Sequence, residues 1–359
     1  MKKIFFILVA FATIAACSKS EVTYTENDSI SFSPVAYNQT KAAIAAGSSP
    51  TCPLIVSAFA GTTADQTTYS EPYFKNVEFT DANLDGIFEA SGYFWPNVKK
   101  LTFAGITKSA GFTESSSVSI YDASNTITDD RDKFIIYNYA QPNVDVDHND
   151  LMWFDRTTPA GKTNNAIDVT MKHACTWIVL NFIGDPTSGN AKRPWKITNV
   201  TINGLSQKEN VTLSTGTAVW TSTGAKTNNL VVYNNGSMTS GGTALSNGGK
   251  FTPSTDGIIV IPQKPTTLSI TYNYVTQFGA DDTVETDDIV IEETATVELN
   301  FDGTADTPDS WSNWSPGTKY TYDVTIGAAA IKIAPKAAEW TIYDADGDSG
   351  NKDNIEIPR

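Results

Sequence analysis

The chain has 359 residues, of which 25 are lysine or arginine and 40 are aspartate or glutamate, so its formal net charge is −15. This charge argues against nucleic-acid binding, because phosphate contacts need lysine and arginine. Hydrophobic residues make up 40% of the chain and charged residues only 18%, which indicates a folded protein rather than a disordered acidic one. The length predicts about two domains.

The first residues have the pattern of a secretory signal. A positively charged start precedes the apolar run 4–12, which is too short to span a bilayer as a helix of the mature protein. The run ends in Ile14-Ala15-Ala16-Cys17, which resembles the lipobox of bacterial lipoproteins. We therefore expect a signal peptide over residues 1–16 and a lipidated Cys17. Its acyl chains, palmitate among them, would anchor the chain in the outer membrane.

The segment after the lipidated cysteine, residues 17–28, is polar and predicts a tether. Further along, residues 74–80 and 87–90 read as two strands. The dipeptide Asp85-Gly86 between them is typical of a tight turn, so we predict a hairpin here.

Most of the later chain alternates between apolar and polar residues with a period of two, which is typical of strands that bury one face. The pattern is clear in 268–274, 297–301 and 320–326. Residues 258–261 are apolar throughout, as in a strand buried on both faces. Clusters of Gly, Asn, Ser and Thr separate these runs, and no stretch of twelve or more residues has helical spacing. We therefore predict an all-β fold of sandwiches or barrels.

The polar stretch 155–165 separates two groups of predicted strands and indicates a domain boundary. We predict an N-terminal β-sandwich domain over residues 29–160. A C-terminal β-sandwich domain over 161–359 would end in a polar tail.

The sequence lacks the motifs of common hydrolases and of phosphate-binding enzymes. It has no Gly-x-Ser-x-Gly elbow, no His-Glu-x-x-His and no glycine-rich phosphate loop. The two histidines, His148 and His173, are single, and His173 lies in the strand-like run 169–175, which favours a packed structural role. We therefore expect no enzymatic activity and no catalytic residues.

One acidic segment near the C-terminus is similar to a calcium-binding loop of the EF-hand type, although its glycine and its glutamate each come one place late. A second segment, 81–86, opens like such a loop, but Gly92 stands where the last glutamate belongs, so a hairpin turn is favoured there. No cofactor other than calcium is expected. The candidate calcium ligands are Asp344, Asp346, Asp348 and Glu356.

Two tryptophans, Trp311 and Trp314, lie in a polar loop before a predicted strand. Exposed aromatic rings can stack on sugars, so both are candidate glycan contacts; the alternative is that they fill the core of a sandwich. A monomeric surface lipoprotein that binds glycans or host ligands through exposed aromatics is therefore one functional hypothesis.

The mature chain keeps Cys52 and Cys175 besides the lipidated cysteine. Export permits a disulfide between them. The alternative is two buried small side chains in strands, and the sequence leaves both open.

The order of several motifs resembles the fimbrillin family of Bacteroidales, which comprises the type V pilins and their fimbrillin-like relatives. The resemblance covers roughly residues 28 to 342, and it depends on the order of the motifs together with the lipoprotein signal. The motifs that carry it are Tyr73-Phe74-Lys75-Asn76, Tyr93-Phe94-Trp95-Pro96, Leu101-Thr102-Phe103-Ala104, Asp150-Leu151-Met152-Trp153, 169–183, 197–204, 257–263, 314–320 and 331–340.

This resemblance implies two tandem transthyretin-like β-sandwich domains and a structural, adhesive role. Family members are exported as lipoproteins, and a surface protease removes the lipid-bearing segment after an arginine. Loss of the first strand opens a groove, which a strand of the next subunit fills, so that subunits polymerise into a fimbrium. An unpaired strand position exposes backbone donors and acceptors together with apolar pockets, which favours such donor-strand exchange.

Mapped onto this chain, the removable strand spans about residues 29–40, with Ile30, Phe32 and Pro34 on one face and the serines between them on the other. The processing site falls at Lys41, where the family has an arginine; the first arginine of this chain is Arg131. Either the protease accepts lysine, or the protein stays lipidated as an anchor or accessory component.

The expected partners are other fimbrial subunits, the outer membrane before processing, and a receptor on a host or bacterial surface. The expected location is the cell surface, in a fimbrium. The sequence leaves open whether the role is in stalk, tip or anchor, and which segment donates the strand. The tail 343–359 is polar apart from Ile355 and Ile357, which makes it a poor long donor.

Overall fold

The described residues of the computed structural model form strands and connecting loops, which confirms the predicted all-β fold. Among these residues there is no helix long and apolar enough to cross a membrane. The described residues are 29–36, 50, 52–61, 69–96, 100–112, 117–119, 134–142, 150–157, 159, 162, 163, 165–185, 195–214, 216–222, 226–234, 243–245, 250–253, 257–264, 267–277, 289–299, 314–326, 330–339 and 355–358.

The N-terminal half is built on a seven-stranded sheet of order β3-β2-β5-β8-β9-β1-β4. Only the β1–β9 pair is parallel. The sheet is curled so that its two edges approach each other. Thr80, just after β3, exchanges backbone hydrogen bonds of 2.9 and 3.0 Å with Glu89 of β4. The strands are β1 (Ser29–Ala36), β2 (Leu54–Gly61), β3 (Tyr69–Phe79), β4 (Phe88–Phe94), β5 (Leu101–Thr107), β8 (Met152–Thr157) and β9 (Ile167–His173).

A four-stranded sheet of order β13-β12-β7-β6 packs on the other face of β2, β5 and β8. Side chains from both sheets form a central core, to which Phe59, Ile106 and Trp153 contribute from the first sheet and Tyr139 and Leu213 from the second. All seven residues of β5 are buried, because this strand has a core on each face. The strands are β6 (Ser117–Ser119), β7 (Phe134–Ala140), β12 (Lys208–Ser214) and β13 (Thr217–Ser222).

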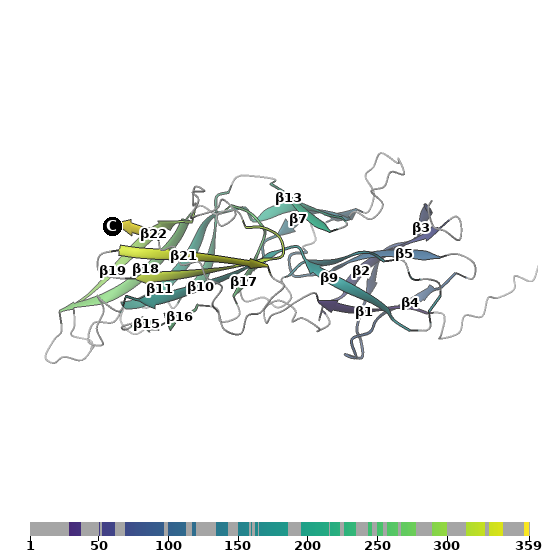
Figure 1. Ribbon diagram of the computed structural model, residues 1–359, viewed down its shortest axis with the longest axis horizontal. Coiled ribbons are helices and arrows are strands. Elements are labelled where there is room, and N and C mark those ends of the chain that lie inside the picture. Colours follow the sequence, from purple (N-terminus) through teal and green to yellow (C-terminus); the bar gives the residue numbers. More distant parts are fainter. Residues whose placement is uncertain are drawn as a thin grey trace, which may run out of the picture.

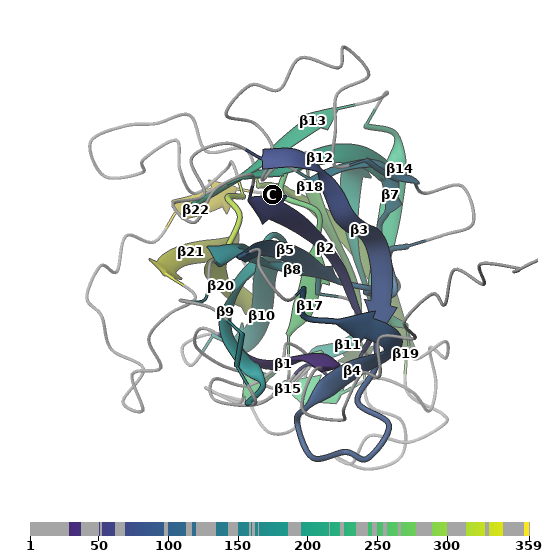
Figure 2. The ribbon, with the colours of Figure 1, turned by 90° about the vertical axis from the view of Figure 1, so that its right-hand side faces the viewer.

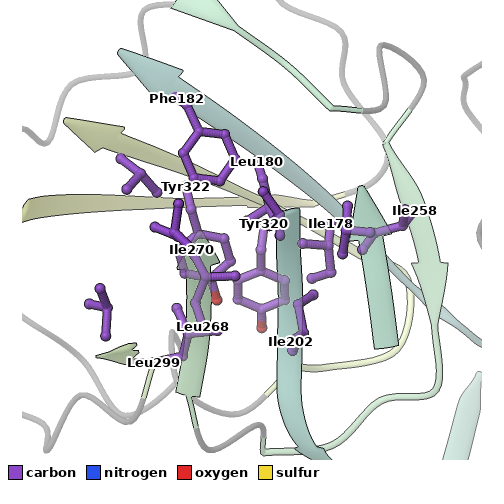
Figure 3. Packing of buried hydrophobic residues seen from close by; sticks show 14 of the residues in the cluster. Ile178, Leu180, Phe182, Ile202, Ile258, Leu268, Ile270, Leu299, Tyr320 and Tyr322 are labelled. Carbon is purple, nitrogen blue, oxygen red and sulfur yellow. The ribbon is translucent and has the colours of Figure 1, made fainter. Parts of the chain in front are cut away.

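The C-terminal half is a sandwich of two sheets, one of order β16-β10-β20-β21-β22 with β17 also on β10, the other of order β14-β11-β18-β19 with β15 also on β11. Its core includes Tyr320 and Tyr322 of β20, which point toward Leu268 and Ile270 of β18 (Figure 3). The strands are β10 (Thr176–Gly184), β11 (Trp195–Leu205), β14 (Asn228–Asn234), β15 (Thr243–Leu245), β16 (Lys250–Phe251), β17 (Ile258–Val260), β18 (Thr267–Gln277), β19 (Ile289–Glu298), β20 (Thr318–Ile326), β21 (Ala330–Glu339) and β22 (Ile355–Pro358).

The two halves lie end to end along the long axis (Figure 1). Two strands, β10 and β17, contribute side chains both to the C-terminal core and to the central core. Ile258 and Val260 of β17 face the C-terminal core, whereas Ile259 and the adjoining Ile261 face the central core. The prediction that 258–261 is buried on both faces is confirmed, since all four side chains are buried. The halves are therefore packed together rather than joined by a free linker.

The predicted boundary at 160/161 falls in the connection between β8 and β9, which pair with each other through Met152 and His173. Strand β12, from the C-terminal half of the sequence, pairs with β7. The chain thus crosses between the halves more than once. The number of domains and their bounds stay predictions.

Candidate functional site

Strand β1 fills a slot between β4 and β9 in the seven-stranded sheet (Figures 1 and 2). On one side Phe32 to Ala36 run parallel to Ile167 to Met171. On the other side Ser29, Ser31 and Phe32 lie opposite residues of β4 in an antiparallel pair with one irregularity. The strand therefore has partners on both sides, and its departure would leave β4 and β9 with unpaired ladder edges facing each other.

The inward face of β1 has the composition that the sequence predicts. Ile30, Phe32 and Pro34 are buried, with the first two 0% exposed, while Ser31 and Ser33 are half-buried. The predicted alternation is confirmed. A strand of this kind binds its slot through apolar side chains on one face and backbone hydrogen bonds along both edges.

Phe32 is the centre of an aromatic cluster inside the curled sheet. Its ring meets Phe79 edge-on at a centroid distance of 5.0 Å and Phe103 edge-on at 5.2 Å, and it lies 6.0 Å from Phe154. Edge-to-face aromatic pairs contribute beyond the area that they bury. Without β1, these three rings would line an apolar pocket on the floor of the slot.

Several predicted site residues lie outside the described residues: Cys17, Lys41, Trp311, Asp344, Asp346 and Asp348. Glu356 lies in β22, where its backbone is paired with Lys332 of β21. Among the described residues, no group of three or more His, Cys, Asp or Glu side chains is placed to hold a metal ion. Lipidation, processing and calcium binding stay predictions.

Of the two roles that the sequence leaves open for Trp314, the structure shows the core-filling one and not the exposed glycan contact. Its side chain is 2% exposed and belongs to the C-terminal core, and its indole N–H donates to the Tyr322 hydroxyl over 2.8 Å. The polar residues around Trp314 in the sequence give no sign of its burial. The tryptophan lies just before β20 and packs at the end of the sandwich. Its ring face is covered by other side chains and cannot stack on a sugar.

The predicted turn at Asp85-Gly86 lies in the connection between β3 and β4, but these strands are joined only by the isolated bridge between Thr80 and Glu89 and do not form a paired hairpin. The Asp81 carboxylate accepts the backbone N–H groups of Asp85 and Gly86 over 3.1 and 2.9 Å. Gly86 has a positive φ of 83°, which glycine adopts without strain. Both Asp81 oxygens thus stabilise the turn itself.

A buried polar cluster lies where the chain passes from β9 to β10. His173 Nδ1 and Asp150 Oδ2 are 2.5 Å apart, and both side chains are at least 95% buried. Burial raises the pKa of Asp150, and His173 opposes that shift. The sequence predicts the packed role of His173, which its burial confirms, but it gives no signal for Asp150 as the partner, because 23 residues separate the two.

Cys52 and Cys175 are free thiols and are both buried. This agrees with the alternative of two buried small side chains. Burial raises the pKa of Cys52 to about 12 and also raises that of Cys175. Because the thiolate is the reactive form, both side chains are expected to be inert in the native protein.

We expect native protein at pH 8 to resist alkylation at both cysteines, while urea-unfolded protein reacts at both, as measured by mass spectrometry after iodoacetamide treatment. Because unfolding returns each thiol pKa to its ordinary 9.0, the unfolded chain ionises first and stability falls as the pH rises above about 9. Rapid labelling of Cys175 in native protein would contradict the buried environment.

The architecture defines a class: an all-β protein in which β1, the first strand of the described residues, completes a sheet between β9 and β4. The chain belongs to the fimbrillin-like family, whose sequence pattern matches residues 53–340. The resemblance in the sequence is therefore confirmed. No curated protein matches the sequence.

One solved structure shows a similar fold, and two further ones are less similar. A fimbrial protein from Bacteroides vulgatus is similar with a TM-score of 0.60 at 16% identity, covering 87% of this chain and 99% of that one. Candidate cell adhesion proteins from Bacteroides ovatus and Bacteroides uniformis have TM-scores of 0.48 and 0.46 at 14% and 15% identity. They cover 88% and 87% of this chain and 99% and 98% of their own. At 16% identity the likeness to the Bacteroides vulgatus protein concerns the fold alone.

Proposed function

We propose that this chain is a fimbrial-type adhesion protein of the cell surface, a non-enzymatic subunit that assembles by donor-strand exchange. Membership of the fimbrillin-like family supports the fimbrial role and the interaction with other subunits. The fold of a fimbrial protein from Bacteroides vulgatus is similar over 87% of this chain and 99% of that protein. The observation that carries the assembly mechanism is the position of β1 in a slot between β4 and β9.

Proteolysis between β1 and β2 would leave β1 attached by non-covalent contacts only. We infer that the lipid on Cys17 anchors the newly exported chain and that cleavage at Lys41 releases residues 17–41. The empty slot would then hold two unpaired ladder edges above an apolar floor lined by Phe79, Phe103 and Phe154. A strand from the next subunit would restore the ladder and cover the rings.

The packing of the two halves suits a filament subunit. A subunit that bears load must transmit it from the acceptor slot in the N-terminal half to the rest of the molecule. Strands β10 and β17 belong to the C-terminal sandwich and also contribute side chains to the central core. These two strands therefore pack against residues of both halves. Bending between the halves would disrupt close-packed side chains.

The experiment compares purified protein before and after removal of residues 1–41. Intact protein is expected to keep β1 in place and to form no polymer through the slot, whereas protein that begins at Ala42 should form ladders that resist mild denaturant on gels. A synthetic peptide of residues 29–40 is the control: in excess it should occupy the slot and stop ladder growth, while a peptide carrying Phe32→Asp should not.

A truncated protein that stays monomeric and does not bind the 29–40 peptide would contradict donor-strand exchange. Mass spectrometry of protein from cells gives an independent result. A mature N-terminus at Ala42 supports processing, whereas lipidated Cys17 on all molecules would assign the chain to an anchoring or accessory position.

A further inference from the structure

One long stretch of this acidic chain is almost free of charge. Lys226 is the only charged residue among residues 210–249, whereas charged residues make up 18% of the whole chain. The stretch forms most of β12, then β13 and β14, and each of the last two strands lies at the edge of its sheet. Charged side chains are a common protection of exposed edges, and here they are missing from two edges.

Strand β13 is the more regular of these two edges. It pairs with β12 over six consecutive residue pairs without a bulge, from Glu209–Ser222 to Ser214–Thr217. Strand β14 pairs with β11 across two irregularities. Strand β19, the other edge of the β14 sheet, carries three glutamates in its ten residues. A regular strand without proline, bulge or charge is the best template for pairing with another strand.

The face that β13 turns to solvent is also neutral, and the one exposed charged residue of β12, Lys208, lies beyond the last residue pair with β13. Thr217, Val219 and Thr221 of β13 are exposed, and Val219 keeps 55% of its surface in water. On the opposite face Trp220 packs against the central core and donates its indole N–H to the Ala174 carbonyl over 2.8 Å. The strand is therefore held from within by core contacts, while no strand of the described residues pairs with its outer edge.

We propose that the β13 edge is a homotypic docking surface, through which a second copy of this chain adds its own β13 in antiparallel orientation. A twofold arrangement centred on Val219 places Thr217 opposite the second copy's Thr221 and joins two four-stranded sheets into one. Thr and Val are favourable cross-strand neighbours. In a filament the same contact joins subunits of neighbouring fimbriae side by side, independently of strand exchange.

Charge favours a second copy over a partner of another kind. Two chains of net charge −15 repel each other where their acidic surfaces meet, so close approach requires a neutral region. A partner chosen by electrostatic attraction would instead meet charged side chains at the interface. Self-association through β13 should therefore strengthen as salt screens the repulsion, whereas binding by charge attraction would weaken.

The test uses sedimentation velocity of intact, unprocessed protein over a range of protein and salt concentrations. Wild type should dimerise reversibly, more strongly at higher salt. Val219→Lys places two like charges at the centre of the contact and should weaken dimerisation at least about tenfold. Val231→Lys is the matched control: it changes a valine of similar exposure on β14 and should leave dimerisation unchanged.

Hydrogen exchange of wild-type protein keeps the proposal testable even where a variant folds poorly. Amides of residues 217–222 should become more protected as dimer forms, and those of β14 should not. A monomer at all concentrations, equal dimerisation of Val219→Lys and wild type, or equal loss in both variants would overturn the assignment to β13. Because β1 is in place throughout, none of these results depends on strand exchange.

Discussion

Phe32→Ala is expected to lower the free energy of unfolding by about 3–5 kcal/mol, the range for truncating a fully buried phenylalanine. The ring is 0% exposed and touches Phe79, Phe103 and Phe154, so its loss leaves a cavity inside the curled sheet. Urea unfolding followed by tryptophan fluorescence measures the change. In cleaved protein, the variant strand should also leave its slot faster than wild type.

Ser33→Ala is the matched control for this prediction. Ser33 lies on the same strand, is half-buried and faces away from the aromatic cluster, so its replacement should change the free energy of unfolding by less than about 0.5 kcal/mol. A loss below about 1 kcal/mol in Phe32→Ala would contradict the view that β1 is an integral part of the N-terminal core.

His173→Ala is expected to cost about 3–5 kcal/mol near pH 7, because it leaves the Asp150 carboxylate buried without its partner. The other carboxylate oxygen, Oδ1, already has no hydrogen-bond partner among the described residues. The pair lies where β9 leads into β10, so the damage should extend to the packing between the halves. Equilibrium unfolding in urea at several pH values measures it.

The pH dependence of this variant follows from the direction of the Asp150 pKa. Burial raises that pKa above its ordinary 3.8, and His173 holds it down, so removing the histidine should raise it further. A folded-state pKa above the unfolded value means that stability falls as the pH rises from about 4 through the folded pKa. His173→Ala should therefore lose less stability at pH 4 than at pH 7.

The double variant Asp150→Asn with His173→Gln is the control for the ion pair. It keeps two buried polar side chains but no charge, so it should be more stable at pH 7 than His173→Ala alone. A double variant that is as unstable as the single one would show that side-chain shape, rather than the uncompensated carboxylate, determines the loss.

Much of the fold could be predicted from the sequence because alternation is a local property of a strand. The buried face of β1, the doubly buried run 258–261 and the turn at Asp85-Gly86 all follow from residues close together in the chain. Residue patterns of this kind state which face of a strand meets a core. The motif order similarly pointed to the family that the sequence match then established.

The partners of each strand were decided only by the tertiary structure. Backbone ladders are chemically alike for every strand, so periodicity does not say that β1 lies between β4 and β9 or that β12 reaches back to β7. Trp314 was ambiguous for the same reason, since an aromatic residue in a polar loop is either exposed or a lid on a core. The pairing of Asp150 with His173 likewise needs strands brought together by packing that no local pattern encodes.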